Sequence, residues 1–209
     1  MTTVANSFLV STMKGNANLG GRPRSFDRDE AVKTAMRLFR RHGYEGVSIA
    51  MLTEAIGVAP PSLYAAFGKK ADLYREALDR YAQENPVSMF SNGGQELSLA
   101  EAIDQMFRRA IRAVVNAPGA PGCMITTGLL GCHPDHSDLA KELVDRRAAL
   151  CIRMSDELRQ WLAEERAREA ASFLCAVLQG IAVQARDGVD VAVLHTIAAN
   201  ARTSVAPEA

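Results

Sequence analysis

Cysteine and histidine side chains gather between Cys123 and His136, and these residue types can bind transition metals or act as nucleophiles. Cys132 and His133 complete the group. Their spacing matches no paired-ligand pattern of a zinc site, and Pro134 interrupts the run. We therefore predict no metal site here. For Cys123 the choice stays open between a redox-sensing thiol and an inert core cysteine, with the inert role favoured.

Catalytic motifs do not accompany these residues. The sequence contains no glycine-rich phosphate loop, no HExxH, and no strand–turn–helix setting for a nucleophilic serine. We therefore expect no enzymatic activity and no bound cofactor.

A second set of polar side chains has the chemistry of phosphate binding. Tyr64 and Lys70 offer a hydroxyl and an ammonium group six residues apart, and Arg22 and Arg24 lie in the upstream arm GRPR. Hydroxyls, lysines and arginines make most contacts to nucleic-acid phosphates, and basic arms can enter a minor groove. The alternative for Tyr64 is a core side chain whose hydroxyl points outward.

The stretch 47–70 predicts two short helices that would position this chemistry. Ser48 is a helix N-cap residue, and apolar residues follow it at helical spacing. Gly57 ends this helix, and Pro60 with Pro61 opens the next one. Two short helices joined by a tight turn are the helix-turn-helix pattern. An ordinary helical hairpin is the alternative.

The region from about residue 21 to 83 resembles the DNA-binding domain of the TetR/AcrR family of bacterial transcriptional regulators. The resemblance implies that Ser48, Tyr64 and Lys70 contact the DNA backbone. The residues that carry it are Ala31, Ala35, Leu38, Phe39, Gly43, Tyr44, Ser48, Ile49, Ile56, Gly57, Val58, Leu63, Tyr64, Phe67, Lys70 and Leu73.

The predicted recognition helix departs from the family pattern at its start. Where relatives often carry Ser and then Lys or Arg, this chain has Ala59 and Pro60. Base contacts would then be made by the residues of this helix that are expected to face the groove, which are Pro60, Pro61, Ser62 and Ala65. Small apolar groups pack on thymine methyls, and serine bonds to several bases. We expect modest direct discrimination, with DNA shape and the basic arm contributing the rest.

The remaining helical patterns predict an all-α fold. Residues 1–20 suggest a disordered tail, 21–70 a helix-turn-helix domain, and 71–209 a ligand-binding and dimerisation domain. Ser98 and Glu101 form a capping box that opens a helix to about residue 116. Further helices are expected over 27–42, with Asp27 as its N-cap, and over 70–83, 137–161, 165–186 and 190–201. A short apolar helix is expected over 123–131.

Charge and cysteine usage indicate the compartment. Residues 1–83 carry 12 Lys and Arg against 8 Asp and Glu, whereas residues 84–209 carry 12 against 16. A basic first part beside an acidic remainder fits a DNA-binding head on a body that does not touch DNA. The chain shows no secretory signal and no apolar run long enough to cross a membrane, so we expect a soluble cytoplasmic protein with four reduced cysteines.

The body is expected to dimerise and to bind a ligand. The run 173–183 is apolar on nearly all sides, which suggests cover by a second subunit. The predicted interface residues are Phe173, Val177, Gly180, Ile181, Leu194 and Ile197. The predicted pocket residues are Tyr81, Phe107, Cys123, Met124, Thr127, Trp161, Phe173 and Gln179. Since no Arg or Lys lies between Arg112 and Lys141, and the other arginines of the body fall on charged faces, we expect a neutral, largely apolar ligand.

The resemblance therefore implies a homodimeric regulator, most simply a repressor released from a palindromic operator by a small ligand. Within the family, an activator or a ligand-independent regulator is the alternative. Outside it, the alternative is a helical small-molecule-binding protein or an enzyme without DNA activity. The basic arm with Tyr64 and Lys70 argues against this last class.

Overall fold

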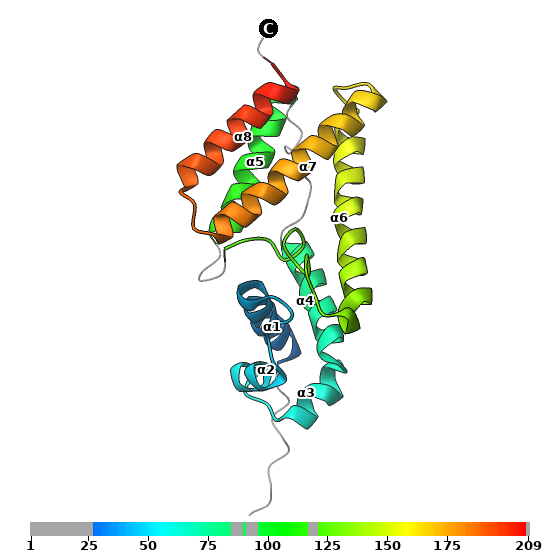
Figure 1. Cartoon of the computed structure of the whole chain (residues 1–209), viewed down its shortest axis with the longest axis vertical. Coiled ribbons are helices and arrows are strands. Elements are labelled where there is room, and N and C mark those ends of the chain that lie inside the picture. Colours follow the sequence, from blue (N-terminus) through cyan, green and yellow to red (C-terminus); the bar gives the residue numbers. More distant parts are fainter. Residues whose placement is uncertain (1–26, 85–89, 91–95, 117–120, 208–209) are drawn as a thin grey trace, which may run out of the picture.

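The structure is a computed structural model, and it describes residues 27–84, 90, 96–116 and 121–207. Helices account for its regular structure, and the described parts of the chain contain no strand, which confirms the predicted all-α class. The helices are α1 (Arg28–His42), α2 (Ile49–Ile56), α3 (Pro60–Phe67), α4 (Lys70–Glu84), α5 (Leu99–Val115), the 3-10 turn η1 (Pro134–His136), α6 (Ser137–Leu158), α7 (Glu164–Arg186) and α8 (Val191–Val205) (Figure 1).

Local capping residues start and stop the first helices as predicted. Asp27 accepts from the backbone N–H groups of Asp29 and Glu30 at the start of α1. Ser48 caps α2 by accepting from a backbone N–H, and Gly57 ends α2 with a left-handed φ of 77°. The predicted capping box at the start of α5 is also present.

The first four helices share one apolar core, which we call the head core. Phe39 of α1 and Tyr74 of α4 meet edge to face, with ring centroids 4.9 Å apart. Tyr44, in the turn between α1 and α2, packs 5.1 Å from Tyr74. Met124, Leu139 and further residues from outside these helices complete the core. Helix α4 therefore packs as part of the head, while it also leads toward the body (Figure 1).

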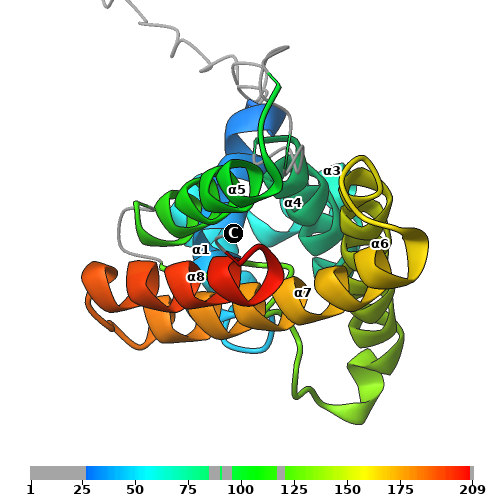
Figure 2. The same cartoon turned by 90° about the horizontal axis from the view of Figure 1, so that it is seen from above.

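A second cluster, the body core, lies between α5, α7, α8 and the C-terminal half of α6. Helix α5 crosses behind α7 and α8, as the view from above shows (Figure 2). Its side chains Ile103, Phe107 and Ile111 are almost completely buried. Trp161, in the turn after α6, is partly buried and donates its indole N–H to the carbonyl of Leu97 at 2.9 Å.

Helix α6 belongs to both cores. Its first half contributes Leu139 and Leu143 to the head core, and its second half contributes Met154 and Leu158 to the body core. Ion pairs reinforce its contact with α4. Glu142 accepts from Arg75 at 2.6 Å, and Arg146 donates to Asp79 at 2.6 Å. Because exposed ion pairs contribute little, shared apolar burial is the main link.

The segment 123–131 forms turns, so the predicted short apolar helix is wrong. The carbonyls of Ile125 and Gly128 accept from a side chain of another element, whereas the Cys123 carbonyl accepts from Thr127 within the segment. Arg147 of α6 donates to the carbonyls of Ile125 and Gly128, at 3.0 and 3.1 Å. Leu129 adopts a positive φ of 49°, which interrupts a right-handed helix. Tertiary hydrogen bonds here outweigh a weak local preference.

A polar contact joins the head to the start of α6. The Glu45 carboxylate, in the turn after α1, accepts from the backbone N–H of His133 at 3.0 Å and lies 2.7 Å from His136 Nδ1. These hydrogen bonds lower the pKa of Glu45, the backbone bond from His133 being the largest cause. The His136 ring also packs against Tyr44, with centroids 4.9 Å apart.

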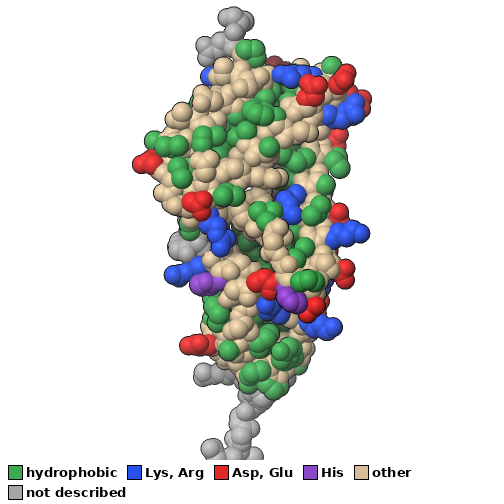
Figure 3. Space-filling model, viewed as in Figure 1, with side chains coloured by type: hydrophobic (Ala, Val, Ile, Leu, Met, Phe, Trp, Pro, Cys, Tyr) green, Lys and Arg blue, Asp and Glu red, His purple; other side chains and the backbone are tan. Residues whose placement is uncertain are grey.

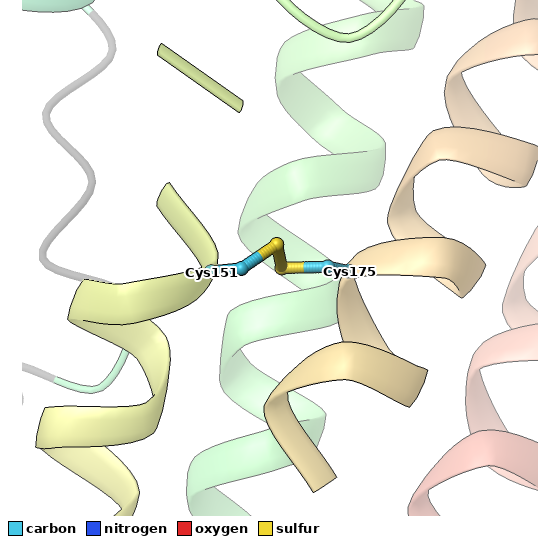
Figure 4. Close-up of a disulfide and its surroundings, with 2 residues drawn as sticks. All are labelled: Cys151 and Cys175. Atoms are coloured by element: carbon cyan, nitrogen blue, oxygen red, sulfur yellow. A yellow bond between two sulfur atoms is a disulfide. The ribbon is translucent and has the colours of Figure 1, made fainter. Parts of the chain in front are cut away.

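Two of the four cysteines are paired, which corrects the expectation of reduced thiols for them. Cys151 of α6 and Cys175 of α7 form a disulfide with a Cα–Cα distance of 6.1 Å (Figure 4). Cys123 and Cys132 are free. The pair lies 24 residues apart in sequence on different helices, so spacing alone did not reveal it.

Membrane-spanning potential is low by helix length and composition. Over the described ranges, no single helix is long and apolar enough to cross a bilayer. The pair α2 and α3 meets the criteria only when taken together, and it is bent by 94°.

Substituting Gly128 should destabilise the chain. A Cβ at this position would clash with the Met124 carbonyl oxygen and would lie 3.0 Å from the Tyr74 hydroxyl. We expect Gly128→Ala to lower the free energy of unfolding by about 1–3 kcal/mol, the usual cost of overpacking. Gly131→Ala is the control, because nothing lies within 4 Å of a Cβ there. Equal urea midpoints for the two variants would contradict this account.

The Glu45 contact should make a small pH-dependent contribution to stability. Because the folded-state pKa of Glu45 is lowered, its contribution is present above the unfolded value and is lost as pH falls through the folded value. We expect the stability difference between the wild type and Glu45→Gln to shrink as pH falls from 6 to about 3. Thermal unfolding at each pH measures it. The control Glu54→Gln, on the exposed face of α2, should show no such trend.

Candidate nucleic-acid interface

Helix α3 separates a buried face from an exposed face within eight residues. Leu63 and Phe67 are 3% and 5% exposed and fix α3 to the head core. Pro60 and Pro61 fix the backbone of its first turn. The side chains that remain exposed are Pro60, Pro61, Ser62, Tyr64 and Ala65, which are the residues predicted for the recognition helix.

Tyr64 is the most prominent of these side chains. It is 49% exposed, so the alternative of a core position does not apply to it. Leu63 and Phe67 fix the helix to the head core, so the exposed phenol of Tyr64 is available to contact a partner. A tyrosine hydroxyl in this position can donate to a phosphate oxygen.

Ser48 has a structural role that is compatible with phosphate binding. Its Oγ accepts from the Met51 backbone N–H at 3.1 Å, which caps α2. The hydroxyl hydrogen is not used by this bond, because the oxygen is the acceptor. The side chain is exposed, so it can donate to a phosphate while it caps the helix.

Lys70 points inward, and this was not expected from the sequence. Its ammonium donates to the carbonyls of Tyr44 and Val47, both at 3.0 Å, and lies 4.1 Å from the centroid of the Tyr44 ring. Burial lowers the pKa of Lys70. The side chain therefore holds the turn that leads into Ser48. Its phosphate contact remains a prediction.

The neighbouring Lys69 is exposed and was not nominated by sequence reasoning. Its backbone N–H bonds to Asp72 at 2.9 Å, which places the lysine at the junction of α3 and α4. Two adjacent lysines cannot be distinguished by spacing alone, because the turn geometry decides which one points outward. Arg22 and Arg24 lie outside the described residues.

The eight predicted pocket residues are divided among the head core, the body core and the surface, and the pocket remains a prediction. Tyr81, Cys123, Met124 and Thr127 gather where the segment after α5 meets α4. The Cys123 thiol and the Tyr81 hydroxyl are hydrogen-bonded, and the Thr127 hydroxyl donates to the Cys123 carbonyl at 2.6 Å. The other four lie elsewhere: Phe107 and Trp161 belong with the body core, Gln179 is half-buried on α7, and Phe173 is exposed at 43%.

The predicted interface residues divide between core and surface. Ile181 and Leu194 are buried within the subunit at 1% and 0% exposure, so they support the body core instead. Phe173, Val177, Gly180 and Ile197 are exposed or half-buried on α7 and α8. Val183 and Val193, 40% and 47% exposed, extend this face and were not predicted. Among the described residues, no cluster of three or more His, Cys, Asp or Glu is arranged to hold a metal ion.

Comparisons with known proteins agree with this geometry. The family model described as "Bacterial regulatory proteins, tetR family" matches residues 31–77. The chain is 34% identical to the HTH-type transcriptional repressor ComR of Escherichia coli strain K12, covering 85% of this chain and 88% of ComR. It is 28% identical to the HTH-type transcriptional repressor BdcR of the same strain, over 92% of this chain and 95% of BdcR.

A solved structure is similar over nearly the whole fold. It is a cysteine mutant of the TetR family transcriptional regulator CifR, complexed with a 26 bp double-strand operator DNA. The two chains are 32% identical, with a TM-score of 0.79, over 88% of this chain and 99% of the CifR chain. The helix-turn-helix geometry, the matched family model and the extent of these similarities together show that the chain belongs to the TetR family of bacterial regulatory proteins.

Proposed function

We propose that this protein is a DNA-binding transcriptional repressor that acts in the cytoplasm and has no enzymatic activity. The main observation in its support is the arrangement of α3: Leu63 and Phe67 fix its buried face, while Ser62 and Tyr64 are exposed. ComR and BdcR, which resemble the chain over most of its length, are named repressors. The similar CifR structure was solved with operator DNA.

In this proposal, α3 lies in the major groove and α2 crosses the backbone. Ser48 and Tyr64 bind phosphates and set the register, whereas Pro61, Ser62 and Ala65 face the base edges. Lys69 adds an exposed positive charge beside α3. Of the three side chains that would face the base edges, Ser62 is the one that can form a hydrogen bond. Direct base recognition would therefore be modest, and DNA shape would supply part of the specificity.

Dimerisation would use the exposed face of α7 and α8. Phe173, Val177, Gly180 and Val183 lie along α7, and Ile197 lies on α8. On this part of the surface, hydrophobic side chains lie among backbone atoms and uncharged polar side chains, whereas charged side chains lie mainly at its margins (Figure 3). Two copies related by a two-fold axis would present their α3 helices to half-sites about 34–36 Å apart.

Release by a ligand would act at the junction of the two cores. Tyr81, Cys123, Met124 and Thr127 meet there, and Arg40 of α1 donates to the carbonyls of Gly122 and Ala113 nearby. A small, mostly apolar ligand that inserts beside this segment would displace α4 relative to α1. It would reduce DNA affinity only if it binds the displaced arrangement more tightly.

Removing the Tyr64 hydroxyl should weaken DNA binding without changing specificity. We expect Tyr64→Phe to lower affinity roughly tenfold on all sequences, since one hydrogen bond to a charged group is worth about 1.5 kcal/mol. The salt dependence should stay unchanged, because no cation is removed. Fluorescence anisotropy on DNA selected from a random pool measures both quantities.

Ser204→Ala, an exposed hydroxyl lost from the far end of α8, is the matched control and should bind like the wild type. An altered base preference for Tyr64→Phe would overturn the phosphate role. If the wild type selects no DNA at all, the proposed function itself fails.

A charge on the α7 face should prevent dimerisation. We expect Phe173→Glu to give a monomer in sedimentation at micromolar concentration, because it places an unpaired carboxylate in an apolar interface. Leu130→Glu is the control: Leu130 is 65% exposed in the segment after α5, outside α7 and α8, and its variant should remain a dimer. A wild-type monomer, or dimers for both variants, would contradict the proposed interface.

A further inference from the structure

We propose that the Cys151–Cys175 disulfide is a thiol-exchange site, at which a low-molecular-weight thiol attacks Cys151, and that opening this bond weakens DNA binding. The exchange itself is inferred from the geometry of α6 and α7 around the disulfide. Its effect on DNA rests on the proposed function. Cys123 and Cys132 take no part in it.

The disulfide is reachable from one side only. Cys175 of α7 is 3% exposed and faces the body core, whereas Cys151 of α6 is partly exposed. The bridge spans the space between the two helices (Figure 4). An incoming thiol therefore meets the Cys151 sulfur first, and Cys175 is the leaving group.

A surface groove of about 290 Å³ leads to Cys151. It is lined by the α6 residues Cys151, Ile152, Ser155, Asp156 and Arg159 and by the α7 residues Glu164, Arg168, Ala171 and Ser172, and Cys175 is not among them. The groove thus opens onto Cys151, which is also the more exposed cysteine of the pair.

The charges in the groove suit a zwitterionic thiol. Arg159 and Arg168 can each bind a carboxylate, while Asp156 and Glu164 can bind an ammonium group. The existing pairs, Arg159 with Glu164 at 3.7 Å and Arg168 with Glu164 at 3.9 Å, are long and exposed. Such surface pairs contribute little, so a ligand can replace them. A small thiol peptide that carries both charges is the class of reagent that fits.

The exchange follows ordinary thiol chemistry. The thiolate of the small molecule attacks Cys151 Sγ, a new S–S bond forms, and the bond to Cys175 breaks. Cys175 leaves as a thiolate and takes up a proton. A second thiolate then attacks the small molecule's sulfur in the mixed disulfide, which releases Cys151 as a thiolate that is protonated in turn. The protein disulfide is reduced to two thiols, and two small thiols are oxidised to one disulfide.

The position of the bond couples this exchange to the head. Cys151 lies between the two ends of α6, close to Met154 and Leu158, which belong to the body core. Leu143, two turns earlier, belongs to the head core. The disulfide therefore fixes α6 to α7, the helix proposed to dimerise. Disulfides in a reducing compartment are usually transient or redox-sensing, which fits a bond used as a switch.

The exchange is tested by mass spectrometry on the full chain carrying Cys123→Ser and Cys132→Ser. Without reductant, we expect Cys151 and Cys175 to resist alkylation. With glutathione as the probe, a mixed disulfide should appear on the Cys151 peptide and an alkylatable thiol on Cys175. Free thiols in the untreated oxidised protein, or glutathione on Cys175 instead, would overturn the proposed site.

The coupling is tested by anisotropy on DNA selected by the oxidised protein. We expect reduction to weaken binding roughly fivefold or more, the lower range of allosteric coupling. A matched variant that also carries Cys151→Ser and Cys175→Ser should bind like the reduced protein and ignore thiols. Equal affinity of oxidised and reduced protein would overturn the coupling. If the oxidised wild-type chain selects no DNA, the proposed function fails, while the mass measurement still decides the exchange.

Discussion

The structure depends on one helix being buried in two places at once. Helix α6 gives Leu139 and Leu143 to the head core and Met154 and Leu158 to the body core. Protein interiors are close-packed, so neither end of α6 can shift without disturbing the side chains around it. The relative position of head and body is thus a consequence of apolar burial along a single rigid element, supported by the Arg75–Glu142 and Arg146–Asp79 pairs.

The segment after α5 occupies the space that this arrangement leaves. Because it is not helical, its carbonyls are available to arginines from both sides: Arg40 of α1 binds Gly122, and Arg147 of α6 binds Ile125 and Gly128. Cys123 packs against both cores. A change in this segment reaches the head and the body together, which is the physical requirement for any coupling between a ligand and α4.

Features set by local chemistry were predictable from the sequence. The caps Asp27 and Ser48, the stop at Gly57 and the exposed face of α3 follow from residue type and helical period. Features set by contacts between distant residues could not be predicted from the sequence. The turns over 123–131 depend on Arg147, and the inward position of Lys70 depends on the carbonyls of the turn at 44–47. The partners of Cys151 and of Glu45 lie on other elements.

The two faces of α3 have an evolutionary consequence. Leu63 and Phe67, together with the partly buried Ala66, tie this helix to the head core, while Ser62 and Ala65 are exposed. Substitutions at exposed positions away from caps and cores usually change stability by less than about 0.5 kcal/mol. A duplicated copy of this gene can therefore accumulate changes at positions 62 and 65 without passing through unfolded intermediates, so descendants with divergent recognition surfaces lie within a few mutational steps of this chain.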